Sequence, residues 1–336
     1  MAAYYTLQVA RRDWRLFQRY IRRHRLPEDL VTWELLAKSS PELEEVWKEL
    51  YSILRDGGYT LWPTASNGVS SSPGQVRNDP LSRAARAREG HGVIIRVIVV
   101  KEEGHKHIRI LRKIATGEVS LCSDNHTLPL FGELELEDII FGIFPKVNGI
   151  VKGADGTWAT NSVGDIIDML MQMLEALVFI HRMNIAHCDA FCDNFAIQWQ
   201  PESLKKMKNS PCRPRVYLTN FEYAVEFSPD WPARHRILRG PPQKNSFRND
   251  KPYTRPAPTE VTSLRLYNPF KLDVWQVGNA FSNITTTIGP IDAILMRMVA
   301  DTAVRESAQK TLDRLTTVVH SMTAESLLFP PITLTN

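Results

Sequence analysis

The order of apolar and polar positions predicts helices and strands along most of the chain. The strongest signal covers residues 165–182, where Ile166, Leu170, Met173 and Leu177 belong to a broad apolar stripe at helical spacing. Further helices are predicted over residues 28–54 with a break near Pro41, and over 104–114, 271–281, 291–300 and 306–320. Strands are predicted over residues 93–100, 138–144, 195–199 and 216–218.

The amino-terminal region is basic, and a segment rich in Ser, Gly, Asn and Pro follows it. Residues 8–26 favour a helix that carries seven arginines, which we interpret as a solvated face; a nuclear-localisation or acidic-partner patch is the alternative. Residues 64–80 cannot bury enough apolar surface to fold alone. The sequence therefore predicts a helical extension over residues 1–63 and a flexible linker over 64–90.

Composition narrows the class of protein. The 336 residues include 41 Lys and Arg against 37 Asp and Glu, and 43% are hydrophobic, which is typical of a globular chain with about two domains or one bilobal domain. The net charge of +4 is small and argues against a nucleic-acid partner. Four cysteines without paired C-x-x-C spacing predict free thiols in a reducing compartment.

No stretch of the sequence predicts a signal peptide or a membrane span. The most apolar run, residues 93–100, is interrupted by Arg96 and falls short of the roughly 18 apolar residues that a span needs. Arg11 and Arg12 precede any apolar stretch that could serve as a signal peptide. We therefore expect an intracellular protein, cytoplasmic or nuclear, with no membrane association.

The segment His-Cys-Asp-Ala-Phe-Cys-Asp-Asn at residues 187–194 carries the most informative chemistry. It lies between the long predicted helix and a short strand, and Asn220 follows the next strand. A carboxylate such as Asp189 can accept or orient the proton of an attacking hydroxyl, and the side-chain oxygen of Asn194 can ligate Mg²⁺. We predict that Asp189, Asn194 and Asn220 converge on a site for a metal ion and a triphosphate.

This pattern resembles the protein-kinase superfamily. Residues 187–194 stand where kinases carry H-R-D-x-x-x-x-N, and Asn220-Phe-Glu stands where they carry D-F-G. The segment from Asp273 to Gly278 looks like the start of the central helix of the kinase C-lobe, whose Asp supports the catalytic loop. The amino-acid sequence of several stretches resembles that of the divergent kinase-like proteins expanded in fungi. These stretches include residues 47–63, 125–129, 217–222 and 269–273.

A fourth stretch, residues 301–312, resembles a segment near the end of the kinase C-lobe. The resemblance implies that its arginine, Arg305, pairs with Glu260. It also implies a bilobal α+β protein-kinase-like fold that follows the helical extension. A small lobe with an antiparallel sheet would span residues 91–147, a larger helical lobe 148–325, and a tail 326–336.

The resemblance further implies roles for individual residues if the protein is active with ATP and Mg²⁺. Asp189 would be the catalytic base, Asn194 would hold Mg²⁺, and Asn220 would be a weakened second metal ligand. Arg96 would contact the phosphates. The adenine-contacting hinge would include Ile143, Phe144 and Pro145. The substrate would be a Ser or Thr hydroxyl of a protein.

Several departures from the kinase pattern weaken this expectation. Arg96 stands in place of the third-strand Lys, Lys106 and His107 stand where a partner Glu is expected, and no G-x-G-x-x-G precedes Val93. Asn220 replaces a charged metal ligand with a dipole. We therefore predict a pseudokinase or weak Ser/Thr kinase that acts partly by binding an unidentified protein partner. The alternatives are an active Ser/Thr kinase and a small-molecule phosphotransferase of the choline or aminoglycoside kinase type.

Overall fold

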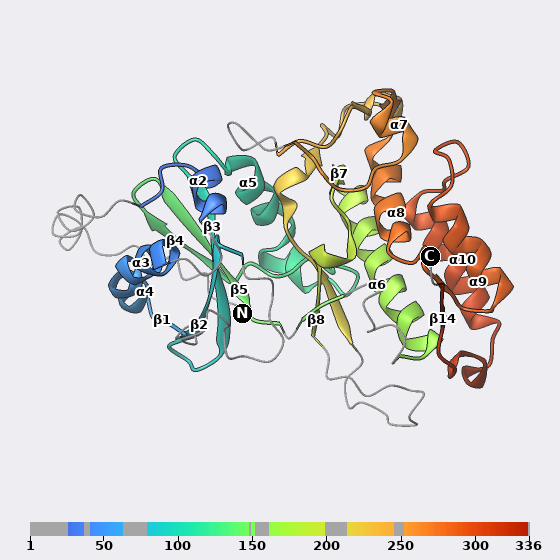
Figure 1. The fold of residues 1–336 in the computed structure, drawn as a ribbon, viewed down its shortest axis with the longest axis horizontal. Coiled ribbons are helices and arrows are strands. Elements are labelled where there is room, and N and C mark those ends of the chain that lie inside the picture. The colour runs from blue at the N-terminus through green and yellow to red at the C-terminus, as the bar shows by residue number, and fades with distance from the viewer. Residues whose placement is uncertain are drawn as a thin grey trace. The chain divides into compact units, whose positions relative to one another are not determined.

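The computed structural model describes residues 26–36, 41–62, 79–147, 149–151, 161–198, 214–244 and 252–334 (Figure 1). The chain divides into two compact units. The first unit holds the described residues up to Glu118 together with Pro129–Val147. The second unit holds Val119–Leu128 and the described residues from 149 onward. The basic helix predicted over residues 8–26 lies outside the described residues, except for Leu26.

The first unit is built on a five-stranded antiparallel sheet with the strand order β1-β2-β3-β5-β4. The strands are β1 (Tyr59–Leu61), β2 (Ser82–Ala87), β3 (Gly92–Val100), β4 (Gly132–Leu136) and β5 (Ile139–Pro145). Along β3, Val93, Ile95 and Val97 are buried in the core of this unit, whereas Arg96 belongs to the opposite face. The strands predicted over residues 93–100 and 138–144 are thus confirmed.

Of the flexible linker predicted over residues 64–90, residues 64–78 lie outside the described residues, and strand β2 corrects the prediction for residues 82–87. Residues 82–87 pair with β1 on one side and with β3 on the other. Ala85 and Ala87 are buried, so this strand contributes only methyl groups to the core. Alanine has low β propensity and gives a weak alternation signal, which is why the sequence pattern does not reveal the strand.

Three short helices pack in the same core as this sheet: α2 (Leu30–Leu35), α3 (Pro41–Glu49) and α4 (Tyr51–Asp56). Trp33 and Trp47 meet edge to face with ring centroids 5.8 Å apart, and the Trp47 indole donates to the Pro80 carbonyl oxygen at 3.2 Å. Pro41 is the first residue of α3, as the predicted break implies. The predicted helical extension therefore shares its core with the sheet.

Helix α5 (His105–Ile114) follows β3 after a tight turn at Gly104. Gly104 has a φ of 87°, and a Cβ atom there would lie 1.8 Å from the Ile98 carbonyl oxygen. Only glycine can occupy this position without a backbone shift. The helix itself agrees with the prediction over residues 104–114.

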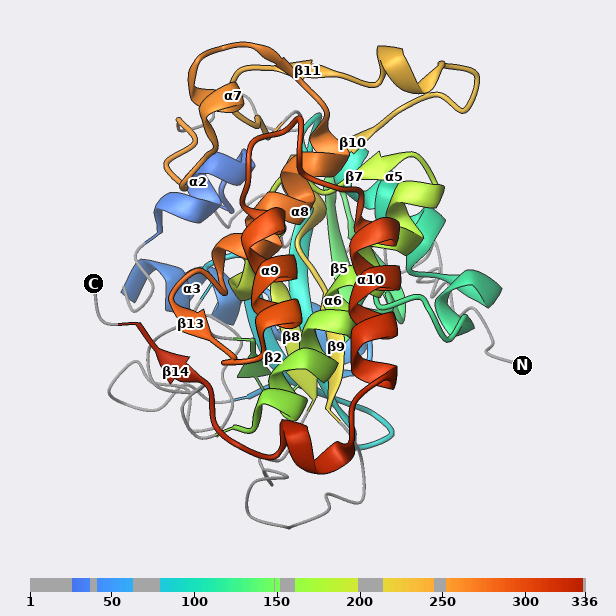
Figure 2. The same cartoon turned by 90° about the vertical axis from the view of Figure 1, so that its right-hand side faces the viewer.

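The second unit is mainly helical. Helix α6 (Val163–Arg182) begins with a capping box between Ser162 and Asp165, and its apolar stripe is buried. Helices α8 (Pro269–Asn279) and α10 (Ala308–His320) pack beside it, and α9 (Gly289–Met298) packs against α8 and α10 (Figure 2). A short helix, α7 (Thr259–Thr262), precedes α8. These elements confirm the helices predicted over residues 165–182, 271–281, 291–300 and 306–320.

Small sheets connect these helices and position the loop at residues 187–194. Strands β7 (Ile185–Ala186) and β10 (Val225–Glu226) pair with each other, and β8 (Phe195–Gln198) lies between β6 (Gly149–Ile150) and β9 (Arg215–Leu218). The other pairs are β11 (Leu238–Arg239) with β12 (Leu266–Tyr267) and β13 (Ile284–Thr285) with β14 (Ile332–Thr333). The loop therefore enters from β7 and leaves into β8.

The architecture is mixed α+β: a curled five-stranded antiparallel sheet is followed by a more helical region. This agrees with the predicted class and with the predicted order of a sheet before helices. Among the described residues, none of the helices combines the length and the apolar character needed to cross a bilayer.

Candidate functional site

The backbone of the loop at residues 187–194 is held by the buried Asp273 on α8. The Asp273 carboxylate accepts hydrogen bonds from the backbone N–H groups of His187 at 2.8 Å and Cys188 at 2.7 Å. It also lies 2.8 Å from Nε2 of His181. Cys188 has a φ of 61°, a conformation that non-glycine residues rarely adopt, so the bonds to Asp273 hold a strained turn in place.

Two further polar side chains complete the support of this loop. The Gln276 amide donates to the Cys188 carbonyl and accepts from the Ala190 N–H, both at 2.8 Å. His187 is fully buried, and burial lowers the pKa of its imidazole. Its Nδ1 accepts from the Asp189 N–H and its Nε2 lies 2.9 Å from the Thr219 carbonyl, so a neutral ring with the proton on Nε2 satisfies both contacts.

The structure brings together the three residues that the sequence analysis expected to converge. Asn194 ends the short 3₁₀ turn Cys192–Asn194, and its amide donates to the Asp189 carbonyl at 2.7 Å and to the Asp189 carboxylate at 2.6 Å. Asn220 follows β9, and its amide donates to Oδ1 of Asn194 at 3.3 Å. Asn220 has φ 64° and ψ 69°, a left-handed conformation that Asn tolerates well.

The Asp189 carboxylate is also covered by a segment that the sequence analysis did not assign to the site. Arg255 places Nε 2.9 Å from Oδ1 of Asp189, and the Tyr253 hydroxyl donates to the same oxygen at 3.2 Å. Gln276 donates in turn to the Tyr253 hydroxyl at 3.1 Å. Both residues lie more than 60 positions away in a Pro- and Arg-rich segment without periodicity, so the pattern holds no signal for this contact.

Arg255 is held on three sides. Its Nη1 donates to the Asp193 carboxylate at 2.7 Å, in addition to the contact with Asp189. The guanidinium carbon lies 5.0 Å from the centroid of the Phe191 ring, which meets Trp275 edge to face. Two carboxylates and an aromatic face thus form a binding site for one guanidinium group, and Arg255 of the same chain occupies it.

Burial and these contacts oppose each other at Asp189. Burial raises the pKa of the carboxyl from its ordinary value of 3.8 to about 6, although Arg255, Asn194 and Tyr253 all favour the ionised form. Burial and the neighbouring Asp189 raise the pKa of the Tyr253 phenol, which therefore stays protonated and donates. A carboxyl group with a pKa near neutrality can act as a general base.

The residues around Asp189 fit a magnesium ion poorly. Oδ1 of Asn220 is buried without a hydrogen-bond partner among the described residues, so one oxygen is open to a ligand. The carboxylates, however, already face cations: Asp189 and Asp193 contact Arg255, and Glu222 contacts Nζ of Lys244 at 3.2 Å. Mg²⁺ is usually bound through one or two carboxylates together with phosphate oxygens, and two neutral amides do not replace them.

The remaining predicted site residues belong to the first unit. Arg96 on β3 directs its guanidinium at the Asp79 carboxylate and at the Ser82 hydroxyl. Ile143, Phe144 and Pro145 lie on β5, opposite residues 93–95 of β3, and the Ile143 side chain is buried in the core. The roles predicted for these residues as phosphate contact and adenine hinge remain predictions.

Two other expectations are the pairing of Arg305 with Glu260 and the presence of free cysteine thiols. Arg305 is buried, and its Nη1 donates to Glu260 at 2.8 Å, which is the pair that the kinase resemblance implied. Cys188 and Cys192 are buried free thiols, and burial raises the pKa of both, to about 12 for Cys192. Within the described part of the chain, no group of three His, Cys, Asp or Glu side chains could hold a metal ion.

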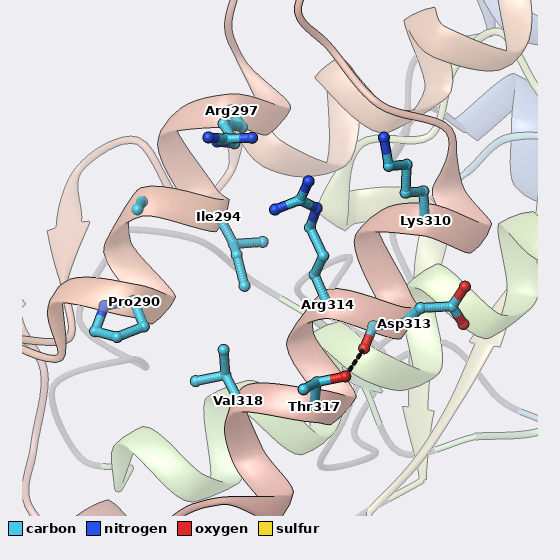
Figure 3. Close-up of a pocket in the computed structure, with 9 residues that line it drawn as sticks. Pro290, Ile294, Arg297, Lys310, Asp313, Arg314, Thr317 and Val318 are labelled. Carbon is cyan, nitrogen blue, oxygen red and sulfur yellow. Dashed lines mark hydrogen bonds between the residues drawn. The ribbon is translucent and has the colours of Figure 1, made fainter.

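A groove between α9 and α10 lies in the same unit and has a volume of about 450 Å³ (Figure 3). Pro290, Ile294 and Val318 line the groove with apolar side chains, and Arg297 and Arg314 reach into it from α9 and α10. Glu306 pairs with Arg314 at 2.8 Å. None of the residues lining the groove belongs to the Asp189 cluster, so the groove is separate from the candidate site.

Neither a known family model nor a curated protein matches this chain in sequence.

Proposed function

We propose that the chain has a protein-kinase-like fold with a degenerate phosphotransfer site, and that it acts by binding rather than by catalysis. In this proposal the first unit corresponds to the sheet-containing lobe and the second to the helical lobe. The convergence of Asp189, Asn194 and Asn220 supports the assignment. The support of the loop by Asp273 and the buried pair of Arg305 with Glu260 are in keeping with it.

One observation carries the functional part of the proposal: the Asp189 carboxylate is bonded to Arg255 and Tyr253 of its own chain. A substrate hydroxyl that approached Oδ1 of Asp189 would compete with the Tyr253 hydroxyl and the Arg255 guanidinium, and Oδ2 already accepts from the Asn194 amide. Asn220 offers a metal ion only an amide dipole, where a carboxylate would supply a full negative charge. Both features oppose phosphoryl transfer, and neither opposes a role in holding a partner.

A nucleotide-binding measurement tests this proposal. We expect ATP with Mg²⁺ to raise the melting temperature of the full chain no more than ATP with EDTA does. The matched variant is Asn220→Asp, which restores the missing carboxylate in a backbone conformation that Asp also tolerates. A shift of several degrees with Mg²⁺ and ATP in the unmodified protein would contradict the proposal.

A weak Ser/Thr kinase is the second candidate, and the raised pKa of Asp189, to about 6, favours it. This candidate requires ATP and Mg²⁺. It predicts measurable label transfer to a protein hydroxyl that Asp189→Ala abolishes and Asn220→Asp increases. If neither the unmodified protein nor Asn220→Asp transfers label to a generic basic or acidic protein substrate, the enzyme hypothesis fails.

A further inference from the structure

The two-stranded sheet of β11 and β12 has one buried face and one exposed face. Leu238 pairs with Tyr267, and these side chains pack with Val261 and Leu272 in a small core. Arg239 pairs with Leu266 on the opposite face, where 65% of the Leu266 surface is exposed. The outer face is therefore open to solvent and apolar in part. Figure 2 shows β11 and α7 at the edge of the second unit.

Two more aliphatic side chains extend this outer face. Ile237 precedes β11 and is 38% exposed, and Leu264 precedes β12 and is 54% exposed. We call this surface the ladder surface; it consists of Ile237, Leu264 and Leu266 together with Arg234, Arg239 and Arg265. Large apolar side chains scattered singly are ordinary on a protein surface, but three on two adjoining segments form a patch that favours an interaction.

The backbone at Leu264 strengthens this interpretation. Leu264 has a φ of 55°, in the left-handed region where Gly and Asn are favoured and a branched aliphatic residue is disfavoured. Its carbonyl accepts a hydrogen bond from Nε of Arg239 at 3.0 Å, which holds the turn. One end of the side chain lies beside the buried Gly240, but 54% of the leucine is exposed in a backbone conformation that disfavours it, and this combination points to a contact outside the chain.

The charge of the ladder surface indicates what kind of partner it fits. Arg239 lies on β11, Arg265 lies between the two exposed leucines, and Arg234 lies in the segment before β11. All three are exposed, and within the described residues none of them forms an ion pair with a carboxylate. Glu260, the acidic residue of α7, is already paired with the buried Arg305.

We propose that the ladder surface is a docking site for an extended segment of another protein that carries both acidic and aliphatic side chains. The aliphatic groups would cover Leu264 and Leu266, and the acidic groups would face Arg239 and Arg265. A second copy of this chain is disfavoured because two ladder surfaces would bring arginines together. Single-stranded nucleic acid is disfavoured because the apolar groups are aliphatic and offer bases no ring to stack on.

This inference goes beyond the proposed function, since it requires neither a nucleotide nor a kinase-like fold. The inner face of the same sheet nevertheless packs toward the Asp189 site. Leu238 and Tyr267 share their small core with Trp275, which contacts Phe191 beneath Arg255. A partner on the outer face would therefore contact the same sheet, β11 and β12, whose inner face packs against Trp275 near Arg255 and Asp189.

The test measures the binding of labelled peptides to the full chain by fluorescence anisotropy, without nucleotide. The first probe is a 12-residue peptide of alternating acidic (Asp, Glu) and aliphatic (Leu, Val) residues. The second replaces each acidic residue with Lys, and the third replaces each aliphatic residue with Ser. We expect saturable binding of the first probe, and affinities at least tenfold weaker for the other two.

Variants locate the binding surface. Leu264→Asn combined with Leu266→Ser should weaken binding of the first probe at least tenfold, and Arg265→Glu should weaken it severalfold. The matched controls are Met296→Ser and Arg297→Glu on α9, because Met296 is 72% exposed and Arg297 has no ion-pair partner among the described residues. We expect both controls to bind like the unmodified protein. A thermal melt of each variant checks that it is folded.

Several results would overturn the proposal. They are the absence of saturable binding by the first probe, equal binding of the Lys peptide, and equal losses in the α9 controls. Self-association that Leu264→Asn with Leu266→Ser abolishes would assign the surface to a second copy instead. Binding of a single-stranded oligonucleotide that Arg265→Glu abolishes, without peptide binding, would assign it to nucleic acid. The nucleotide-binding result has no bearing on any of these outcomes.

Discussion

Two buried aspartates of the second unit differ in what holds them: Asp273 on α8 supports the loop at residues 187–194, and Asp189 belongs to that loop. Asp273 accepts from the backbone N–H groups of His187 and Cys188 and contacts His181. Asp189 contacts side chains only: Asn194 within its own loop, and Tyr253 and Arg255 from a distant segment. The first carboxylate is part of the local backbone structure, whereas the second is covered by groups that can leave.

This difference separates a structural role from a functional one. Backbone donors cannot move away from Asp273 unless the loop itself unfolds, so that carboxylate holds geometry and is not free to react. Side-chain donors can leave Asp189 by rotation about single bonds, without any unfolding of the loop. The comparison therefore predicts unequal consequences when each contact is removed.

The largest effect is expected from Asp273→Ala. The substitution leaves two buried backbone N–H groups without an acceptor and removes the carboxylate beside His181. We expect the free energy of unfolding to fall by about 3–5 kcal/mol, the range for breaking a buried charged network. Urea denaturation followed by circular dichroism measures this change.

The matched control for this experiment is Asp124→Ala, since the Asp124 side chain is 51% exposed and forms a longer contact with Arg182. It should change the free energy of unfolding by less than about 0.5 kcal/mol. A loss near that value for Asp273→Ala as well would mean that the two buried aspartates do not differ as we argue.

The pH dependence of stability gives the next largest effect. The folded-state pKa of Asp189 is raised from 3.8 to about 6, so between these values the folded state holds a proton that the unfolded state has lost. The contribution of Asp189 to stability is therefore present in full below about pH 4 and is lost as the pH rises through 6. Two pKa units correspond to about 3 kcal/mol.

Asp189→Asn isolates this contribution, because the amide does not titrate. His187 has a lowered pKa and acts in the opposite direction, but it is present in both proteins and cancels in their difference. We expect the stability of the unmodified protein relative to the variant to decrease between pH 4 and pH 7. A difference that is flat, or that rises with pH, would show that the carboxylate is not held in the buried state described.

A smaller effect is expected from Arg255→Ala, which uncovers Asp189 without disturbing its backbone. Arg255 is about a quarter exposed, so we expect a loss of about 1–2 kcal/mol, less than for a fully buried pair. The pKa of Asp189 should rise further, because the cation that favours its ionised form is gone. An NMR titration of the carboxyl carbon measures this shift, and Arg255→Lys, which keeps a charge, should show less of it.

The elements with strong periodicity could be predicted from the sequence, and those that depend on distant partners could not. Helix α6 and strand β3 follow directly from their apolar patterns. Strand β2 did not, because its alanines give little β signal and its place in the sheet comes from pairing with β1 and β3. Tertiary context overrode a weak local preference there.

The candidate site shows the same limit at the level of side chains. Asp189, Asn194 and Asn220 were identified because their spacing matches a known motif. The pair of Arg305 with Glu260 also followed from that resemblance. Arg255 could not be found in this way, because its contact with Asp189 depends on how an irregular segment returns to the loop. Arg255 and Tyr253, which cover the Asp189 carboxylate, are thus the site residues that the sequence pattern predicts least well.

The smallest predicted effect concerns Leu264 and has the opposite sign. Leu264→Asn places a residue that tolerates the left-handed conformation at a φ of 55°, and it exposes less apolar surface. We expect the free energy of unfolding to rise by about 0.5–1 kcal/mol, measured by urea denaturation. The control is Leu266→Asn on the neighbouring strand, where the backbone is not strained and no gain is expected. If Leu264→Asn destabilises the protein instead, the leucine contributes to packing, and its exposure does not mark a contact with a partner.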